Sequence, residues 1–281
     1  MGGSFMTHVC LIGLGRTGAE IARAVLSQRD MKLAAAICSD FSGKAGKDVG
    51  ETLGLPDTGA KVFTSSQLGH VIEKYKPDVF VDFSNHKATM KHIKEISESG
   101  AGLVIGTTGF SNTDIMRMKV LAKKNGSAIL YAPNITLGVN VMMLLSNLAA
   151  RILSDYDFEI SEAHHKYKKD SPSGTALKIS DQIEEGLQSS GVEVNEPIPI
   201  HAIRAGGIVG RHELLIAGEN DKIEIVHESF SRKVFAEGAI RGIRFIKGKK
   251  GFFEMRDVLN LDRILESYFN KRKVAVMNTS K

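Results

Sequence analysis

Cysteine is scarce in this chain: its 281 residues include only Cys10 and Cys38. Two cysteines cannot build the dense disulfide framework of a small secreted domain, and neither belongs to a CxxC motif or a Cys/His cluster. Cys10 lies in an apolar run and Cys38 at the end of another. We therefore expect two reduced thiols, no metal site and a cytoplasmic protein.

Aromatic residues are also few, at 6% of the chain, and tryptophan is absent. Proteins that bind single-stranded nucleic acid usually combine basic residues with exposed aromatic rings. The formal net charge is +5, and part of this excess lies in Lys249, Lys250 and residues 271–273. We interpret these as solvated surface and tail and expect no nucleic-acid partner. A modest positive charge does suit an anionic substrate and cofactor.

A long uninterrupted apolar run is missing as well. The longest apolar stretch, residues 139–153, contains Asn140, Asn147 and Arg151, which argues against a membrane-spanning helix. The N-terminus has no basic flank followed by an apolar core, so we expect neither a signal peptide nor a membrane partner. Residues 1–5 read as an extension ahead of Met6.

What the chain does contain near its N-terminus is a dinucleotide-binding fingerprint. Residues 8–12 are apolar, residues 13–18 read GLGRTG, and a helical pattern with Ile21 and Val25 on one face follows. Strand, GxGxxG and helix in this order place a pyrophosphate at the helix N-terminus. A second apolar strand at residues 31–38 argues against a glycine-rich turn without a ligand. The predicted cofactor contacts here are Gly13, Leu14, Gly15, Arg16, Thr17 and Gly18.

The end of the second strand normally selects the cofactor. An acidic residue there binds the ribose 2′-hydroxyl, whereas its absence beside basic residues favours a 2′-phosphate. Ser39 occupies the deciding place and Asp40 comes slightly late. Arg16 and Lys44 can approach a phosphate. Our hypothesis is that Ser39 contacts the cofactor and that NADPH is used, with NADH as the alternative.

Strands and helices alternate through the rest of the first half. Apolar runs at residues 79–84, 103–105 and 128–131 are separated by helical patterns, which predicts a parallel sheet with right-handed crossovers. Residues 43–59 are expected to form a glycine-rich surface loop. Ligands bind beyond the carboxyl ends of parallel strands. We therefore predict further cofactor contacts at Gly106, Thr107, Thr108, Ala132, Pro133, Asn134 and Ile135.

Beyond the Ala-Pro-Asn turn the pattern changes. Residues 138–153 predict one long helix, and residues 212–217 and 222–228 predict a hairpin of longer, antiparallel strands. The expected fold class is therefore α/β: a Rossmann-type parallel-sheet domain plus an α+β substrate domain with a mainly antiparallel sheet.

The expected domain boundaries follow from this change. We place a dinucleotide-binding domain at residues 1–134 and a substrate-binding and oligomerisation domain at residues 135–239. The segment 240–281 is expected to return to the first domain.

Residues 159–176, EISEAHHKYKKDSPSGTA, concentrate the chemistry of the chain. The first residues alternate like a strand end. If that strand continues, the side chains of His164 and His165 leave on opposite faces, so the two cannot share a metal. A polar loop follows, and Ser173 opens a helix whose free N–H groups form an anion site. Histidine, lysine and an anion-binding turn within reach of one another suit a reaction on a small carboxylate.

This segment resembles the signature of the 4-hydroxy-tetrahydrodipicolinate reductases, also called dihydrodipicolinate reductases, of bacterial and plant lysine and diaminopimelate synthesis. The resemblance spans nearly the whole chain. It extends to DFS at 82–84, GTTGF at 106–110, PN at 133–134, GVNVM at 138–142, RAG at 204–206, IVG at 208–210 and FEMRDV at 253–258.

The resemblance implies a reaction: hydride transfer from NAD(P)H to a cyclic, unsaturated dicarboxylate, followed by protonation of the ring. By similarity, Lys168 is the proton donor and His164 a donor or acceptor that assists it. A lysine can act as an acid near neutral pH when burial or a positive neighbour lowers its pKa. A homotetramer formed through the sheet of the second domain is also implied. The substrate contacts implied are His165, Ser173, Gly174, Thr175 and Arg241.

Without the resemblance, Lys166, Lys168 and Lys169 are equivalent loop lysines. Glu162 and Asp170 are expected to hold the loop rather than to react.

Three alternatives stay open at this point. Another Rossmann dehydrogenase of amino-acid metabolism would share the first domain but has no reason to keep the whole HHxxKxDxPSGT run. A non-catalytic nucleotide-binding sensor would be expected to lose His164 or Lys168, and both are present. A basic nucleic-acid-binding protein would bind oligonucleotides in a salt-sensitive manner, which the composition does not favour.

Overall fold

The computed structural model describes residues 6–261, 263–264 and 266–267. These residues form two compact units, one within Met1–Ile135 and Ala236–Lys281 and the other within Thr136–Phe235. The expected extension at residues 1–5 and the basic segment 271–273 lie outside the described residues. In the part of the chain that is described, no helix is both long and apolar enough to cross a membrane.

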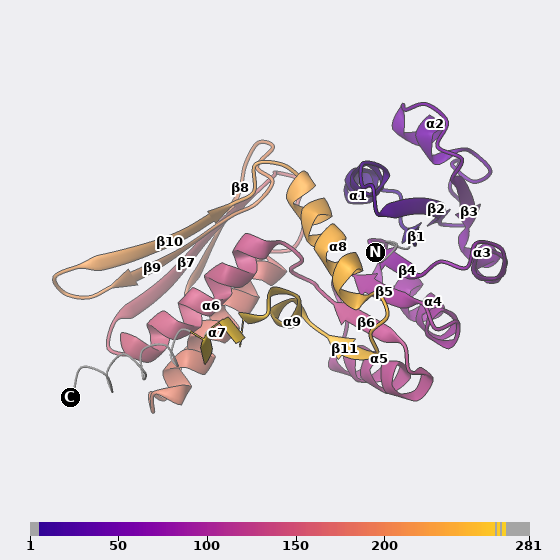
Figure 1. The fold of residues 1–281 in the computed structure, drawn as a ribbon. Coiled ribbons are helices and arrows are strands. Elements are labelled where there is room, and N and C mark those ends of the chain that lie inside the picture. Colours follow the sequence, from indigo (N-terminus) through magenta and orange to yellow (C-terminus); the bar gives the residue numbers. More distant parts are fainter. Residues whose placement is uncertain (1–5, 262, 265, 268–281) are drawn as a thin grey trace, which may run out of the picture. The chain divides into compact units, whose positions relative to one another are not determined.

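The first unit is built on a parallel sheet (Figure 1). Its strands are β1 (Thr7–Ile12), β2 (Met31–Cys38), β3 (Lys61–Thr64), β4 (Val79–Asp82), β5 (Gly102–Ile105), β6 (Ala128–Tyr131) and β11 (Gly251–Phe253). Their order is β11-β6-β5-β4-β1-β2-β3, so the direction of winding reverses between β1 and β4. Ligands bind at such a switch point. The expected Rossmann-type sheet is confirmed.

Helices cover both faces of this sheet. The short runs of Val, Ile and Leu in β4, β5 and β6 are buried on both sides, as in sheets that helices sandwich. On one face, Phe80, Leu103 and Ile129 pack against Ile93 and Met118. The helical elements are α1 (Arg16–Leu26), α2 (Val49–Leu53), the 3₁₀ turn η1 (Ser65–Gln67), α3 (Leu68–Tyr75), α4 (His86–Glu98), α5 (Asn112–Asn125), α8 (Lys233–Ile246) and α9 (Met255–Leu259).

The C-terminal segment completes the first unit. Strand β11 pairs in parallel with β6. Helix α8 packs closely on the sheet, because a Cβ added to Gly242 would lie 2.8 Å from the Leu130 side chain. Residues that are far apart in the sequence therefore share one core.

The prediction of a loop across residues 43–59 was wrong in part, because α2 lies inside it. Asp48 caps this helix by accepting a hydrogen bond from Gly50 N, and Gly54 ends it in the left-handed conformation with φ 67°. A helix of five residues is too short to show a hydrophobic period, so only its two caps were visible in the sequence.

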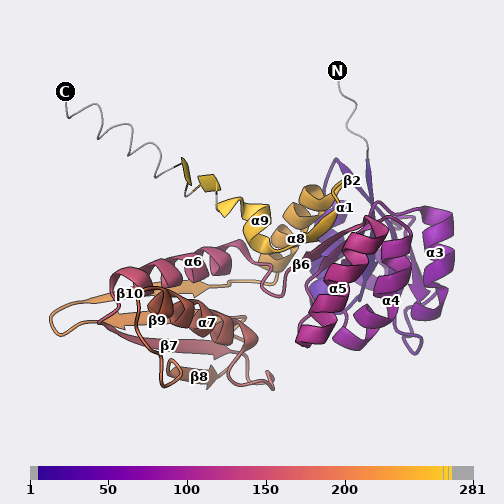
Figure 2. The same ribbon diagram turned by 90° about the horizontal axis from the view of Figure 1, so that it is seen from below.

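The second unit is a sheet with two helices on one face. Its elements are α6 (Leu137–Ile152), β7 (Asp157–His164), α7 (Gly174–Ser189), β8 (Ile200–Arg204), β9 (Arg211–Ala217) and β10 (Lys222–Glu228). The strand order is β10-β9-β7-β8, with β7 and β8 parallel and the other pairs antiparallel. Helices α6 and α7 lie side by side (Figure 1 and Figure 2). The mainly antiparallel sheet is confirmed.

The core of this unit lies between the helices and one face of the sheet. Ile160, Leu214 and Ile216 contribute the sheet side, and Ile179 and Ile183 of α7 the helix side. Burial alternates along β9, so every second residue faces away from the helices. No described element of this unit covers that opposite face.

Candidate active site

The candidate active site begins at the carboxyl end of β7. Phe158 and Ile160 of this strand point into the core, and the same alternation places Glu162 and His164 on the core face. Strand β7 ends at His164, so His165 leaves the sheet instead of continuing it. A buried carboxylate and a buried imidazole thus follow directly on apolar core residues.

Glu162 is the centre of this cluster, and its side chain is fully buried. His164 Nδ1 donates to Oε2 at 2.5 Å, and the backbone N of Ser173 donates to Oε1 at 3.0 Å. The Arg204 guanidinium donates to the same carboxylate with both terminal nitrogens, Nη1 to Oε2 at 2.9 Å and Nη2 to Oε1 at 2.6 Å. Both carboxylate oxygens are therefore occupied by donors from three segments of the chain.

The protonation states follow from these contacts. Burial opposes ionisation of Glu162, but the hydrogen bonds from Arg204, His164 and Ser173 outweigh it and lower the pKa of the carboxyl. Burial lowers the pKa of His164 despite Glu162, and the charges of Lys168 and Arg204 act in the same direction. A neutral imidazole next to an acceptor-only carboxylate carries its hydrogen on Nδ1, which leaves Nε2 as the free nitrogen.

His212, a residue of β9, lies next to His164. The two rings meet edge to face with their centroids 5.2 Å apart, and His212 Nε2 lies 3.3 Å from Ser173 Oγ. Burial, followed by the charge of His164, lowers the pKa of His212 to about 3. His212 therefore stays neutral across the physiological range and contributes a polar contact rather than a charge.

The N-terminus of α7 faces this cluster. Ser173 is the N-cap, and its side chain accepts from Ala176 N. The first turn has no acidic residue, and Gly174 is exposed with nothing within 4 Å of where a Cβ would stand. Glu162 engages the N–H of Ser173, and the helix start at the open Gly174 can receive a further carboxylate.

The loop between β7 and α7 carries Lys168. Its ammonium lies 2.9 Å from Asp170 Oδ2, and its side chain is 22% exposed, whereas Lys166 and Lys169 are exposed residues. Arg204 Nη2 donates to the Asp170 carbonyl at 2.7 Å. The residue that binds Glu162 therefore also holds the lysine loop.

Two predicted substrate contacts make none of the hydrogen bonds described for this cluster. His165 is half-buried, and among the described residues its Nδ1 has no hydrogen-bond partner. Arg241 is exposed on α8, which belongs to the first unit from residue 236 on. The structure thus groups His164, Lys168 and Ser173, with Gly174 and Thr175 directly following in α7.

Glu162, His164 and His212 also place three potential metal-ligating atoms within 4.8 Å of one another. Both oxygens of Glu162 already accept hydrogen bonds, and the Arg204 guanidinium holds positive charge against them. A cation would have to displace that guanidinium and leave it buried without its partner. We interpret the trio as an ion-pair and hydrogen-bond cluster rather than as a cation site.

The glycine-rich loop between β1 and α1 fits a dinucleotide. Gly13 adopts φ +93°, and a Cβ there would lie 2.6 Å from the Phe83 carbonyl oxygen at the end of β4. A Cβ on Gly18 would collide with the Gly13 carbonyl. Gly15 is exposed, with open space where a Cβ would stand. The three glycines thus allow the turn, the close approach of a pyrophosphate and the packing of helix on strand.

Residues beyond the end of β2 are arranged around this loop. Lys44 Nζ donates to the Leu14 carbonyl at 2.5 Å, and Arg16 and Ser39 are exposed. The Asp40 carboxylate accepts from Ser66 N at 2.9 Å. That backbone hydrogen bond is the main cause of the lowered pKa of Asp40.

Buried Asp82 links the loop after β4 to the predicted cofactor loop after β5. Its Oδ1 accepts from Ser84 Oγ at 2.6 Å and from Thr107 Oγ1 at 3.1 Å. The Thr107 hydroxyl is therefore engaged inside the unit, whereas Thr108 is exposed. Ala132 and Ile135 are buried, so only their backbones remain available to a cofactor, while Gly106, Pro133 and Asn134 are half-buried.

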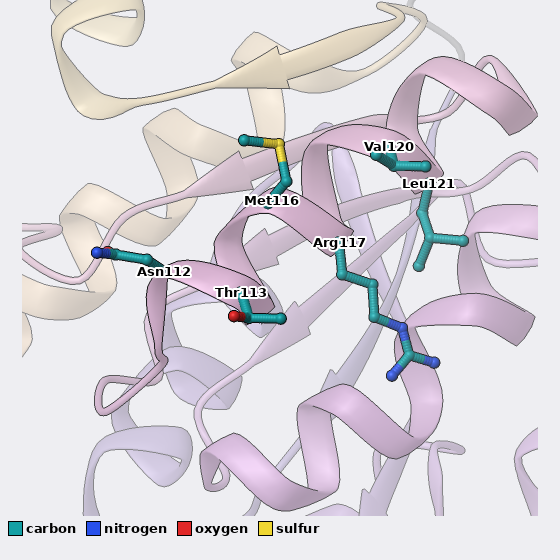
Figure 3. Close-up of a pocket in the computed structure, with 6 residues that line it drawn as sticks. All are labelled: Asn112, Thr113, Met116, Arg117, Val120 and Leu121. Carbon is teal, nitrogen blue, oxygen red and sulfur yellow. The ribbon is translucent and has the colours of Figure 1, made fainter.

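A separate hollow of about 600 Å³ lies along the outer side of α5 (Figure 3). Met116 and Val120 are more than half exposed there, and Arg117 extends away from them. None of the predicted cofactor or substrate residues lines it. Among the described residues, its lining contains no carboxylate, histidine or cysteine.

The glycine-rich loop at the switch point of a doubly wound sheet defines the class of protein: this is a Rossmann-type dinucleotide-binding protein. Two family profiles then cover most of the chain. The profile described as "Dihydrodipicolinate reductase, N-terminus" matches residues 7–135, and the one described as "Dihydrodipicolinate reductase, C-terminus" matches residues 138–259. The chain belongs to the dihydrodipicolinate reductase family.

Individual relatives agree with this assignment. The 4-hydroxy-tetrahydrodipicolinate reductase of Methanothermobacter thermautotrophicus is 40% identical over 92% of this chain and 100% of its own length. That of Methanocaldococcus jannaschii is 38% identical over 92% of this chain and 99% of its own. A solved dihydrodipicolinate reductase from Paenisporosarcina sp. TG-14, with dipicolinate bound, has a TM-score of 0.73 at 29% identity. The structural match covers 89% of this chain and 98% of the solved chain.

Sequence reasoning gave no role in the chemistry to Arg204 or His212 and treated Glu162 only as a loop holder. The alternation of side chains could have revealed them. In residues 157–164 and 211–217, Glu162 and His212 have the same parity as the core residues Ile160 and Leu214. A polar residue on the core face needs a partner.

Proposed function

We propose that this protein catalyses the reduction of 4-hydroxy-tetrahydrodipicolinate to tetrahydrodipicolinate with NAD(P)H, in the synthesis of lysine and diaminopimelate. One observation carries this proposal within the family assignment. The buried Glu162 carboxylate binds both His164 and the first turn of α7, so a proton-handling group and an anion site share one support. A cyclic dicarboxylate needs both.

The residue roles are part of the proposal. The first unit binds NAD(P)H, which supplies the hydride when bound, and the second unit binds the substrate. The 4-hydroxyl group leaves as water, and the resulting unsaturated ring accepts the hydride. Lys168 gives the proton to the ring, and His164 assists through Nε2. The partial burial of Lys168 supports this residue as the proton donor over the exposed Lys166 and Lys169. The substrate contacts are His165, Ser173, Gly174, Thr175 and Arg241.

The cofactor contacts are proposed on the same basis. The backbone of the glycine-rich loop holds the pyrophosphate, and the loops after β5 and β6 approach the remainder of the dinucleotide. The contacts are Gly13, Leu14, Gly15, Arg16, Thr17, Gly18, Ser39, Gly106, Thr107, Thr108, Ala132, Pro133, Asn134 and Ile135.

NADPH is the proposed preferred cofactor. Asp40, the acidic residue nearest the end of β2, has its carboxylate bonded to Ser66 N, while Ser39 and Arg16 are exposed. In this proposal Ser39 and Arg16 meet the ribose 2′-phosphate, while one oxygen of the Asp40 carboxylate is engaged by Ser66 N. Comparison of kcat/KM for the two cofactors tests this choice, and a strong preference for NADH would overturn it.

The proposed assembly is a cytoplasmic homotetramer formed through the face of the second sheet that α6 and α7 leave open. Ile203 and Val226 are each about half exposed on that face. Two buried, unpaired thiols suit a reducing compartment.

A direct assay tests the function. The purified protein receives the product of dihydrodipicolinate synthase together with NADPH or NADH, and loss of the reduced nicotinamide is followed by absorbance. Turnover with either cofactor is expected. Absence of turnover with both would refute the proposed activity.

A further inference from the structure

The Glu162–Arg204 ion pair lies behind His164 and does not belong to the group of proposed substrate contacts. Glu162 is fully buried and the Arg204 side chain is 17% exposed. The Glu162 carboxylate accepts hydrogen bonds from His164 Nδ1 and the Ser173 backbone N. The Arg204 guanidinium donates to the backbone carbonyls of Ile203 and Asp170, so the pair has four further hydrogen-bond partners among the described residues. Three of these partners lie on segments that carry proposed active-site residues.

We propose that the Glu162–Arg204 pair is the positioning unit of the active site: it fixes the orientation and the Nδ1–H tautomer of His164 and ties this imidazole to the first turn of α7. This inference rests on the proposed function, because it takes His164 as the group that assists proton transfer. The two members of the pair act through His164 and Ser173 rather than on the substrate.

The tautomer follows from the chemistry of the acceptor. An ionised carboxylate has no hydrogen to donate, so a neutral His164 can meet Glu162 only with Nδ1–H. Nε2 then points away from Glu162 as the nitrogen that accepts or returns a proton. A Cβ on Gly210 would stand 3.2 Å from Nε2, so a glycine at that position keeps the space beside this nitrogen free.

Arg204 has a separate task, which is to balance the carboxylate. A buried, unpaired carboxylate would stabilise the imidazolium and raise the pKa of His164. The bidentate guanidinium offsets that charge, so Glu162 orients His164 without charging it. Because Arg204 also binds the Asp170 carbonyl, the same residue sets the position of the loop that carries Lys168.

The groups that face His164 come from every neighbouring element. Glu162 lies on its own strand, Arg204 on β8 and His212 on β9, and Lys168 acts from the loop. Since His212 stays neutral down to a pKa of about 3, Glu162, Arg204 and Lys168 supply the charges. Removing the positive charge of Arg204 must raise the pKa of His164, and removing the negative charge of Glu162 must lower it.

The experiment uses the opposite signs of these two changes. The full-length protein is labelled with ¹⁵N-histidine, and His164 is assigned by the loss of its signals in His164→Asn. The ¹⁵N shifts of both ring nitrogens are then followed against pH in the wild type, in Arg204→Gln and in Glu162→Gln. We expect the wild type to hold the Nδ1–H form, Arg204→Gln to raise the pKa of His164 by about one unit or more, and Glu162→Gln to lower it and mix the tautomers.

The pH profile of kcat/KM provides the functional readout. The apparent pKa that His164 contributes to this profile should move in the same direction as the pKa from the NMR titration in each variant. At neutral pH, the loss of kcat/KM should be on the order of 10- to 100-fold, by analogy with the partners that orient metal-binding imidazoles. Arg204→Lys retains the charge but not the bidentate geometry, so it should restore the titration of His164 while recovering only part of the rate.

A matched control lies on the same two strands. Glu159 of β7 accepts from exposed His201 of β8 at 2.9 Å, so Glu159→Gln breaks a carboxylate–histidine contact outside the cluster. It should leave both the His164 titration and kcat/KM unchanged. If Glu162→Gln does not fold, the double variant Glu162→Gln/Arg204→Gln removes both buried charges. Its His164 should lose the single tautomer without the rise in pKa expected of Arg204→Gln.

The proposal is overturned if His164 in folded Arg204→Gln and Glu162→Gln, or in the double variant, keeps the wild-type tautomer and pKa. A shift in the same direction in both single variants would also overturn it. Neither readout by NMR requires turnover. If the wild type does not reduce the proposed substrate, the proposed function fails while the positioning of His164 is still decided.

Discussion

At the scale of the residue, burial separates side chains that are alike in the sequence. Three lysines lie within residues 166–169, and only Lys168 is partly buried and paired, with Asp170. A lysine that is held in place and shielded from water can deliver a proton to a bound ring, whereas a solvated lysine cannot be oriented.

We predict that Lys168→Ala lowers kcat about 100-fold or more, because it removes the proposed proton donor. Binding of NADPH, measured by titration calorimetry, should stay unchanged. Lys169→Ala is the matched control and should have wild-type kcat. A mild effect of Lys168→Ala would mean that the acid has been assigned to the wrong residue.

His212 should make the protein sensitive to acid. Its pKa is lowered by burial from 6.5 to about 3, so between these values the unfolded chain binds more protons than the folded chain. Stability is therefore complete above 6.5 and falls as the pH drops toward 3, by about 2 kcal/mol at about pH 5 from this group.

The corresponding measurement is urea unfolding at a series of pH values. Below pH 6.5, His212→Gln should reduce the slope of the unfolding free energy against pH by the equivalent of about one bound proton, whatever the effect of the substitution on stability at neutral pH. The exposed His201→Gln should keep the wild-type slope. Identical slopes for His212→Gln and wild type would show that His212 is not the acid-sensitive group.

At the scale of the element, the β1–α1 loop shows how similar glycines have different tasks. A Cβ on Gly18 would collide with the Gly13 carbonyl, whereas a Cβ on Gly15 would meet nothing within the protein. The fold therefore requires a glycine at 18, whereas the open space at Gly15 is where we propose that the pyrophosphate approaches.

This difference predicts opposite outcomes for two alanine variants. Gly15→Ala should fold with nearly wild-type stability but bind NADPH at least about tenfold more weakly, a loss of about 1.4 kcal/mol. Gly18→Ala should lower the free energy of unfolding by about 1–3 kcal/mol through overpacking. Thermal unfolding and calorimetric titration of both variants distinguish the two. Wild-type affinity in Gly15→Ala would contradict the predicted pyrophosphate site.

Element boundaries were predictable where the hydrophobic pattern was long. Strand β2, expected at residues 31–38, occupies Met31–Cys38, and the helix expected at 138–153 is α6, Leu137–Ile152. The five-residue α2 was missed because less than two turns cannot display a period.

At the scale of the whole molecule, the open face of the second sheet leads to a prediction about assembly. Val226 on β10 and Ile203 on β8 are each about half exposed and point away from α6 and α7. Val226→Asp and Ile203→Asp should dissociate the proposed tetramer, because burying an unpaired carboxylate costs several kcal/mol. Light scattering after size-exclusion chromatography measures the mass. Met116→Asp on exposed α5 is the control, and an unchanged mass in all variants would refute an interface on this sheet face.

The chain by itself determined the fold class, the glycine-rich loop after the first strand and the segment that we propose carries the chemistry. These features depend on the periodicity and spacing of residues that are close together in the sequence, so they can be read from the sequence alone. Only the tertiary structure decided which groups work together. Glu162 meets Arg204 across 42 positions, and His212 meets Ser173 across 39. Such contacts are selected by strand register and burial, and burial also set the charge of His164, because the free energy of an ionised group depends on the atoms packed around it.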